Sequence, residues 1–249
     1  MSGLLSCLGY PVTDEKGFLA LLEACARKGE RVEAVRGCYR RWSPGGNVEI
    51  WVQENEAGEL VGLNPFYAGA NRVPVLVRRA ISLPRGGEMD GAFLGSVGYQ
   101  DELAPEREFD ILFEAPDILR HPRSDLPGLF PVRLSAFAFA LQVFADVEEF
   151  RRVGGMSDAG PDRFLAHGLY TEEGEYAPEP EAHAIFSGRV LECARRTNPE
   201  TGVVFQWALV ETREMKVEVV GATEDIVGEV EPGRIVQGSF WLAGRLLEV

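Results

Sequence analysis

The C-terminal part of the chain alternates apolar and polar residues with a period of two. Across residues 184–249, runs of this pattern are separated by Gly, Pro and Asn residues that favour turns. Because successive side chains of a strand point to opposite faces, the pattern predicts half-buried strands. Antiparallel strands are expected at residues 185–193, 203–210, 215–220 and 234–247, the first two joined as a hairpin. Residues 182–249 are therefore predicted to form a small all-β barrel, with an OB-like barrel favoured.

The segment 171–181, TEEGEYAPEPE, differs in composition from the chain on either side. It is acidic, contains two prolines and has no apolar periodicity. We therefore predict a linker here, between an N-terminal α+β domain of residues 1–170 and a barrel domain of residues 182–249. The alternative is an exposed loop within one domain, in which case packing would continue across the segment.

The first 170 residues are expected to form mostly antiparallel β structure with a few helices. Apolar residues from Phe18 to Cys25 recur at helical spacing, which predicts a helix over residues 14–28, with Thr13 as N-cap and Gly29 as its stop. Asn64 to Tyr67 is expected to be a loop. Alternation and turn residues predict strands at 32–42, 47–55, 60–63 and 73–83, with weaker candidates at 91–99 and 108–113.

Three later segments complete the expectation for this region. Residues 132–144 fit a buried strand by alternation and a helix by their alanines, and we favour the strand. Asp146 and Glu149 form a capping-box pattern that predicts a short helix ending at Val153. A second short helix is expected over residues 161–167.

Charge and cysteine usage bound the class of protein. The formal net charge is −14, which disfavours nucleic acid as a partner because phosphate binding requires clustered Lys and Arg. The four cysteines show neither C-x-x-C spacing nor a disulfide pattern. The N-terminus lacks a signal-peptide pattern, and no run of about eighteen apolar residues occurs. We expect a soluble cytoplasmic protein of bacterial type with no membrane segment.

The sequence contains no complete catalytic, metal-binding or phosphate-binding motif. His121, His167 and His183 do not occur in metal-ligand spacing, so no metal and no cofactor are predicted. Glu181 and His183 would share a strand face, but an exposed pair at the edge of the linker is the favoured interpretation. Ser239 lacks the context of a nucleophile elbow, and the catalytic residues stay unknown.

The candidate ligand-binding residues lie on two neighbouring strands and the segment that follows. They combine aromatic, cationic, acidic and amide side chains that can line a pocket, in which Arg grips an acidic group and Trp covers an apolar body. A surface ladder of ion pairs and cation–π contacts is the alternative. The candidates are Arg41, Trp42, Glu49, Trp51 and Asn64.

Four C-terminal aromatic residues suggest a second kind of site. Phe205 and Trp207 alternate in phase with apolar neighbours, so we expect Trp207 in the core. Phe240 and Trp241 are consecutive and would face opposite sides of a strand, which leaves one of them available for a partner. Bases stack on such side chains in OB surfaces, but the net negative charge of this part argues against that use.

These observations favour a non-enzymatic protein that binds an unknown small molecule or another protein. An enzyme of unrecognised class, a hydrolase or lyase with a non-local site of His121 or His167 beside a carboxylate, is the alternative. A single-stranded nucleic-acid binder of OB type is a second alternative, disfavoured by charge. A homodimer is compatible with the sequence, which identifies no interface.

Overall fold

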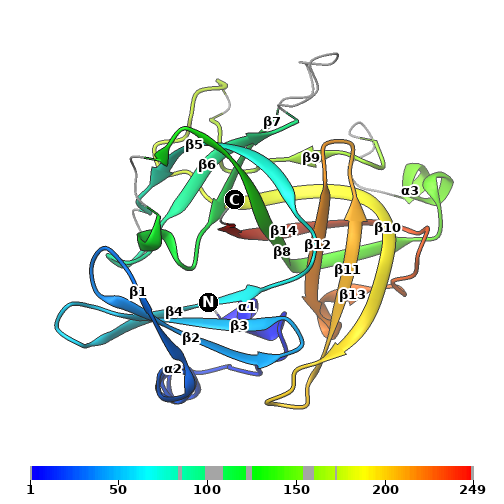
Figure 1. Cartoon of the computed structure of the whole chain (residues 1–249). Helices are drawn as coiled ribbons and strands as arrows, with labels where there is room; N and C mark the ends of the chain where they lie inside the picture. The colour runs from blue at the N-terminus through cyan, green and yellow to red at the C-terminus, as the bar shows by residue number, and fades with distance from the viewer. Residues whose placement is uncertain are drawn as a thin grey trace.

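The computed structural model describes residues 2–83, 86–98, 109–121, 125–153, 160–171 and 173–247. Two sheets organise this part of the chain, one of four strands and one of ten (Figure 1). The four-stranded sheet and the first two helices lie together in Figure 1, and the larger sheet forms the rest of the molecule. The expectation of a mostly β protein with a few helices is confirmed.

The four-stranded sheet is antiparallel, with strand order β1–β2–β3–β4. Two helices precede it, and the second packs against β2, β3 and β4. The bounds are α1 Ser2–Ser6, α2 Glu15–Lys28, β1 Glu30–Glu33, β2 Cys38–Gly45, β3 Val48–Glu54 and β4 Leu60–Tyr67.

The helix predicted near the N-terminus is confirmed as α2. Its N-cap is Asp14 and not Thr13, because the Asp14 side chain accepts a hydrogen bond of 2.7 Å from the backbone N–H of Gly17. Leu22 and Cys25 are buried on the face toward the sheet. The helix stops at Gly29, whose N–H donates to the Cys25 carbonyl.

Two expectations for this sheet are wrong. The strand expected at 32–42 is split into β1 and β2 by a turn in which Gly37 has a φ of 62°. The loop expected from Asn64 to Tyr67 is the second half of β4. Pro65 is compatible with β4 because β4 is at the edge of the sheet, where every second backbone N–H has no neighbouring strand to pair with.

The ten-stranded sheet contains the remaining strands and is mostly antiparallel. The strand favoured at 132–144 is confirmed as the long strand β8. The bounds are β5 Val73–Ile81, β6 Ala92–Val97, β7 Phe109–Glu114, β8 Gly128–Phe144, β9 Phe164–Leu165, β10 His183–Thr197, β11 Val204–Glu211, β12 Lys216–Ala222, β13 Ile226–Val227 and β14 Ile235–Leu246. Two 3-10 helices, η2 Ile118–Arg120 and η4 Thr223–Asp225, and the helix α3 Val147–Val153 lie between them.

The capping box predicted for α3 is confirmed, whereas the helix expected at 161–167 is wrong. The N–H of Glu149 donates to Asp146 over 2.8 Å, and the Glu149 carboxylate accepts from the N–H of Ala145 over 2.6 Å. At 161–167 the chain instead forms β9, which pairs with β10. The ring of Phe164 stacks on that of Phe186 at a centroid distance of 5.2 Å, so tertiary packing outweighs the local helix signal.

Strands β8 and β14 join the two halves of the large sheet. They pair antiparallel from Val132 with Leu246 to Phe144 with Ile235. Strands β5, β6 and β7 connect β8 to β14 on one side, and β12, β11 and β10 connect them on the other. Strand β8, which precedes residues 171–181, therefore pairs with β12 and β14, which follow them.

Strand β3 is buried on both faces because both α2 and the large sheet pack against the four-stranded sheet. Val48, Ile50 and Val52 are fully buried on one face. On the other face Trp51 is also fully buried and contacts Arg245 of β14. The junction between the two sheets is thus a second hydrophobic core, separate from the core enclosed by the large sheet.

Candidate functional site

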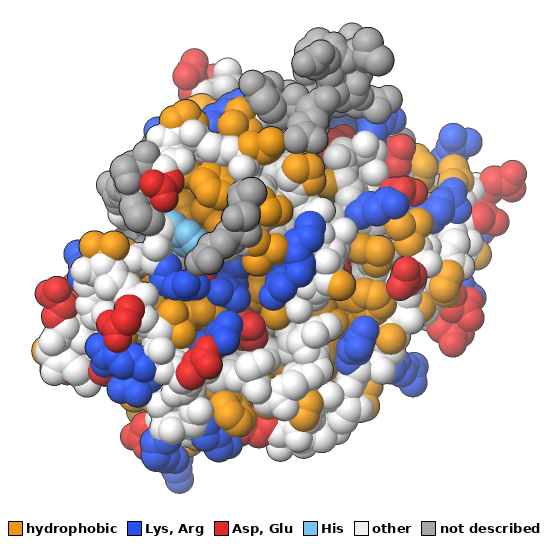
Figure 2. Space-filling view, in the orientation of Figure 1, with side chains coloured by type: hydrophobic (Ala, Val, Ile, Leu, Met, Phe, Trp, Pro, Cys, Tyr) orange, Lys and Arg blue, Asp and Glu red, His pale blue; other side chains and the backbone are white. Residues whose placement is uncertain are grey.

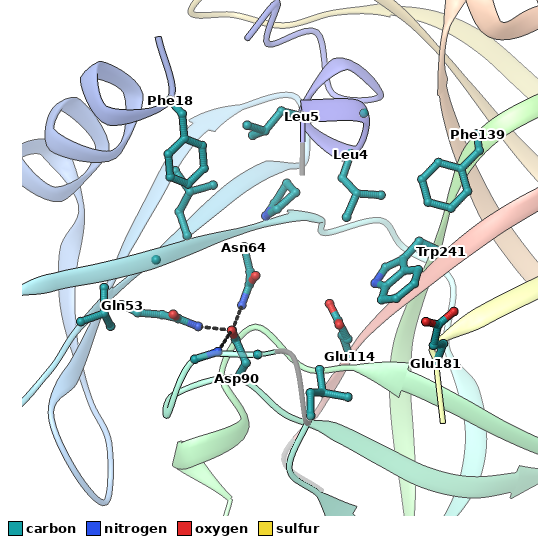
Figure 3. Close-up of a pocket in the computed structure, with 18 of the residues that line it drawn as sticks. Leu4, Leu5, Phe18, Gln53, Asn64, Asp90, Glu114, Phe139, Glu181 and Trp241 are labelled. Carbon is teal, nitrogen blue, oxygen red and sulfur yellow. Dashed lines mark hydrogen bonds between the residues drawn. The ribbon is translucent and has the colours of Figure 1, made fainter. Parts of the chain in front are cut away.

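A cavity of about 450 Å³ lies where α1, the four-stranded sheet and the large sheet meet (Figure 3). Its size is within the range of small-molecule sites. It is lined by Gly3, Leu4, Leu5, Phe18, Gln53, Val61, Gly62, Leu63, Asn64, Pro65, Leu83, Gly86, Gly87, Asp90, Glu114, Phe139, Glu179, Pro180, Glu181 and Trp241.

The upper wall in Figure 3 is apolar. Leu4 and Leu5 of α1, Phe18 of α2 and Phe139 of β8 lie around it, with Trp241 of β14 beside Phe139. The rings of Phe139 and Trp241 meet edge to face, with centroids 6.5 Å apart. Such a wall buries the apolar body of a ligand.

One polar group of the cavity is held by amides of the four-stranded sheet. The Asp90 carboxylate accepts hydrogen bonds from the side chains of Gln53, over 2.5 Å, and Asn64, over 3.1 Å. Its other oxygen accepts from the N–H of Gly87 over 2.7 Å. These three donors keep the negative charge of Asp90 in one position at the cavity wall (Figure 3).

A second carboxyl group, that of Glu114 at the end of β7, is the most perturbed acid of the cavity. Burial raises its pKa to about 7, and the nearby indole of Trp241 and the charge of Asp90 contribute less, in opposite directions. The buried indole N–H of Trp241 has no hydrogen-bond partner of good geometry among the described residues. Figure 3 places Glu114, Glu181 and Trp241 together on one side of the cavity.

The lining of the cavity is acidic. Four of its residues carry carboxyl groups, namely Asp90, Glu114, Glu179 and Glu181. Among the lining residues that the structure describes there is no Lys, Arg or His. Because apolar walls limit screening by water, the cavity favours a positively charged guest over a negatively charged one.

Two of the residues predicted from the sequence, Asn64 and Trp241, line this cavity. They come from strands far apart in the sequence, β4 and β14. The Trp241 side chain is half-buried, whereas Phe240 is fully buried and stacks on Phe186 at a centroid distance of 3.8 Å. Of the consecutive pair, Trp241 is therefore the one available to a ligand.

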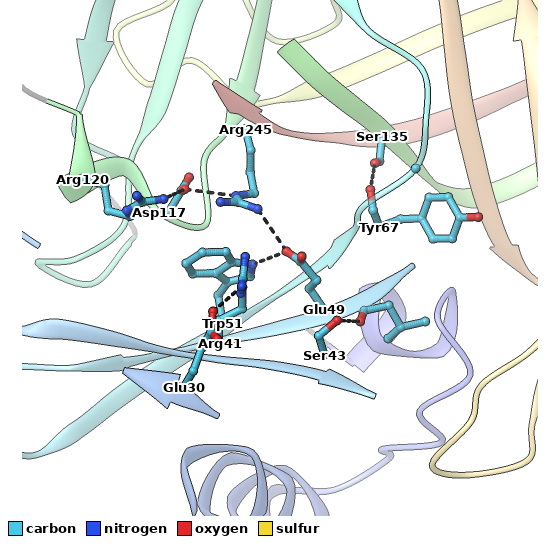
Figure 4. Close-up of polar contacts among 12 residues, drawn as sticks. Glu30, Arg41, Ser43, Glu49, Trp51, Tyr67, Asp117, Arg120, Ser135 and Arg245 are labelled. Carbon is cyan, nitrogen blue, oxygen red and sulfur yellow. Dashed lines mark hydrogen bonds and ion pairs between the residues drawn. The ribbon is translucent and has the colours of Figure 1, made fainter. Parts of the chain in front are cut away.

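Glu49 and Trp51 lie instead in a buried polar network around Arg245 (Figure 4). The guanidinium of Arg245 donates to Asp117 over 3.0 Å and to Glu49 over 3.3 Å. The Trp51 indole N–H donates to the same Glu49 oxygen over 2.8 Å, and the Arg245 guanidinium lies 4.3 Å from the Trp51 ring centroid. These groups are used within the protein, where they hold the two sheets together.

Arg41 and Trp42 lie toward the outside of β2, where they meet neighbouring charges. Arg41 forms an ion pair with Glu30 and lies 5.7 Å from the Trp51 ring. The Trp42 indole N–H donates to Glu200 over 3.0 Å. Neither residue lines the described cavity, so the five candidates of the sequence are not brought into one pocket.

Asp90 and Glu114 are two acidic lining residues that sequence reasoning missed. Asp90 follows a glycine-rich stretch, and Glu114 ends a weakly patterned strand. Neither position belongs to a motif, and the two are brought together by the large sheet. An acidic residue directly after an apolar strand is the weak signal that could have pointed to Glu114.

The histidines lie in two different places. His121 Nε2 is 3.7 Å from Asp117, whose pKa is lowered because His121 and Arg245 outweigh the effect of burial. His167 and His183 instead face one another, with their Nδ1 atoms 3.0 Å apart. No group of three or more His, Cys, Asp or Glu suited to a metal ion occurs in the part of the chain that the structure describes.

Charged side chains of both signs are interspersed on the face shown in Figure 2, with several basic side chains near its centre. The C-terminal aromatics Phe205 and Trp207 are buried, and the placement of Trp207 in the core is confirmed. Within the described ranges, none of the helices has the length and apolar character needed to span a membrane.

No known family, curated protein or solved structure matches this chain.

Proposed function

We propose that this protein binds a small organic cation with an apolar body, such as an amine, in the cavity between the two sheets. The observation that carries the proposal is an apolar cavity of about 450 Å³ whose charged lining residues, within the described ranges, are all acids. This interpretation keeps the binding protein favoured by the sequence and assigns it a class of ligand.

The perturbed carboxyl of Glu114 supports a cationic ligand. A carboxyl whose pKa is about 7 is held partly neutral by its surroundings, because burial penalises its charge. An ammonium group placed near Glu114 stabilises that charge and lowers the pKa. Binding then releases protons near neutral pH, and the affinity rises as the pH increases through 7.

The aromatic wall supports the same class of ligand. The face or edge of Trp241 is available beside Glu114 and Glu181, and Phe139 adjoins it. An ammonium group gains both ionic and cation–π stabilisation at such a place. The apolar wall of leucines and Phe18 then covers the remainder of the ligand.

The test is isothermal titration of the full chain with three probes of matched size. The probes are phenethylammonium, the neutral 2-phenylethanol and the anionic 3-phenylpropionate. We expect the cation to bind at least about tenfold more tightly than the alcohol, which corresponds to about 1.4 kcal/mol. The anion is expected to bind most weakly, because the carboxylates repel it.

The variant E114Q should weaken binding of the cation more than binding of the alcohol, because it removes the charge and keeps the shape. The matched control is E192Q, which removes an exposed carboxylate on β10. Equal affinity for the cation and the anion, or the same effect of E114Q and E192Q on cation binding, would contradict the proposal.

The two other functions considered have less support. The first is a hydrolase or lyase with His121 or His167 beside a carboxylate. Asp117, the carboxylate next to His121, is fully buried and hydrogen-bonded to Arg245, and His167 faces the ring of His183. A single-stranded nucleic-acid binder needs exposed aromatics beside basic residues, whereas Phe205, Trp207 and Phe240 are buried.

The remaining expectations stay predictions. They are a cytoplasmic location, a protein partner or homodimer, a division into two domains at residues 171–181, and an OB-like C-terminal barrel. The pairing of β8 with β14 weighs against the division, because β8 precedes residues 171–181 and β14 follows them.

A further inference from the structure

Three side chains that do not line the cavity form a continuous hydrogen-bonded chain. Ser239 Oγ lies 2.6 Å from His183 Nε2. The other nitrogen of the same ring, His183 Nδ1, lies 3.0 Å from His167 Nδ1. A hydroxyl, an imidazole and a third group that orients the imidazole are the parts of an activated serine nucleophile.

The register of the large sheet produces this chain. His183 begins β10 and pairs with Trp241 of β14, and Ser239 lies two residues before Trp241. Residues two apart share a strand face, so His183 and Ser239 are diagonal neighbours on one face of the sheet. The pairing of Leu165 with Ile185 brings His167 to the same place.

The side chains are accessible. His167 is exposed, and His183 and Ser239 are half-buried. Phe139 meets the His183 ring edge to face at a centroid distance of 6.1 Å, and it also lines the cavity. The hydroxyl therefore lies near the cavity wall without belonging to it.

We infer that Ser239 is a nucleophile toward small carboxylic esters, with His183 as its general base and His167 as a positioning residue. This requires His183 to carry its proton on Nδ1 and donate it to His167 Nδ1, which leaves Nε2 free to accept from the Ser239 hydroxyl. The inference uses other atoms than the proposed cation site and does not depend on it.

The reaction balances with water as the only co-reactant. Ser239 Oγ forms a bond to the ester carbonyl carbon, and its proton moves to His183 Nε2. The bond from that carbon to the alcohol oxygen breaks, and the alcohol leaves with the proton from His183. Water then attacks the acyl-serine with His183 again as base, which releases the acid and restores the serine.

The charge state of His183 suits a general base. Burial and the neighbouring His167 lower its pKa below the ordinary value of 6.5, and the charge of Glu181 opposes them. Phe139 and Trp241, which adjoin it from β8 and β14, carry no charge. His183 is thus neutral at pH 7, where a base must be free of its proton.

The test is covalent labelling of the full chain with a fluorophosphonate, read by intact mass and by the mass of the labelled peptide. The serine oxygen displaces fluoride at phosphorus, and the proton again moves to His183. We expect one label, at Ser239, with a rate that rises with pH through a midpoint below 6.5. The variant S239A should lose the label, and S43A, which removes a serine on β2, should keep it.

Two histidine variants separate chemistry from structure. H183A should slow labelling by at least about 100-fold, the typical contribution of a general base. H167A should slow it less and move the pH midpoint, and H167N should restore part of the rate because its amide oxygen can accept from His183 Nδ1. The urea unfolding midpoint of S239A should remain as in the wild type, which shows that the chain is folded without recourse to the proposed cation site. No label in the wild type, a label at another residue, or a rate unchanged by H183A would overturn the inference.

Discussion

Replacing Glu114 by Gln should make the protein more stable at high pH and leave it nearly unchanged at low pH. In the folded protein, burial raises the pKa of Glu114 from 4.5 to about 7. Between these values the folded state holds a proton that the unfolded state has released, so folding stability falls as the pH rises. Above pH 7 the full cost of burying the charge is present.

The magnitude follows from the shift. A difference of about 2.5 units, from 4.5 to 7, at about 1.36 kcal/mol per unit, corresponds to about 3 kcal/mol. This is an upper value because Glu114 is only half-buried and lines a cavity, where solvent screens part of the charge. Glutamine has the same shape and stays neutral, so E114Q does not bear the cost of burying a negative charge at any pH. The variant therefore differs from the wild type only where Glu114 is ionised.

The assay is urea unfolding of the wild type and E114Q at intervals from pH 4 to pH 8. The difference in free energy of unfolding should grow in favour of E114Q by at least about 1 kcal/mol over this window. The control is E192Q, an exposed carboxylate on β10, for which the difference should stay nearly constant. A difference between E114Q and the wild type that does not change with pH would refute the reasoning.

Two further variants test how the sheets are held together. R245A should lower the free energy of unfolding by about 3–5 kcal/mol, because it removes the guanidinium that donates to the fully buried Asp117 over 3.0 Å. A loss below about 1 kcal/mol in urea unfolding would contradict this. G69A should cost about 1–3 kcal/mol, because a Cβ at Gly69 would overlap the buried Glu218 carboxylate, which hydrogen bonds from the N–H groups of Ala70 and Asn71 hold in place. G3A, where a Cβ meets nothing within 4 Å, is its control, and equal thermal midpoints for the two variants would argue against the overlap.

The elements predicted correctly are those whose signal is local. The helix α2 carries its apolar face, its cap and its stop within residues 14–29. The apolar–polar alternation of residues 132–144 favours a strand over a helix, although the alanines suit both. In each case the signal lies in neighbouring residues of the sequence. The burial of β8 itself does not alternate, because residues 134–138 are all buried between other parts of the fold.

The elements predicted wrongly depend on distant partners. Residues 161–167 have the composition of a short helix, but Phe164 packs between Phe109 and Phe186 and joins β10 as a strand. Pro65 suggests a loop, yet the edge position of β4 removes the cost of its missing donor. Neither effect can be read from the segment alone.

For the candidate site, the types of residue that can line a pocket could be named from the sequence, but the sequence did not show which of these residues face the cavity. Aromatic, acidic and amide residues on the first strands suggested a pocket, and of these Asn64 lines the cavity, together with Trp241, which was predicted as a contact for a partner. Glu49 and Trp51 have the same chemistry but face Arg245, which lies almost two hundred residues further along the chain. From the sequence alone, a residue that lines a pocket cannot be distinguished from a residue in a buried polar network, because the residue that it contacts lies far away in the chain.

The sequence by itself determined that the chain is β-rich and acidic and that no known catalytic motif is present. It also determined where α2 and most of the strands lie. These properties depend only on composition and on the short-range period of apolar residues. Only the tertiary structure decided that Asp90, Glu114 and Trp241 line one cavity and that Ser239, His183 and His167 form one hydrogen-bonded chain. The physical reason is that pairing between strands distant in the sequence sets these contacts, and a one-residue change of register would send each side chain to the opposite face.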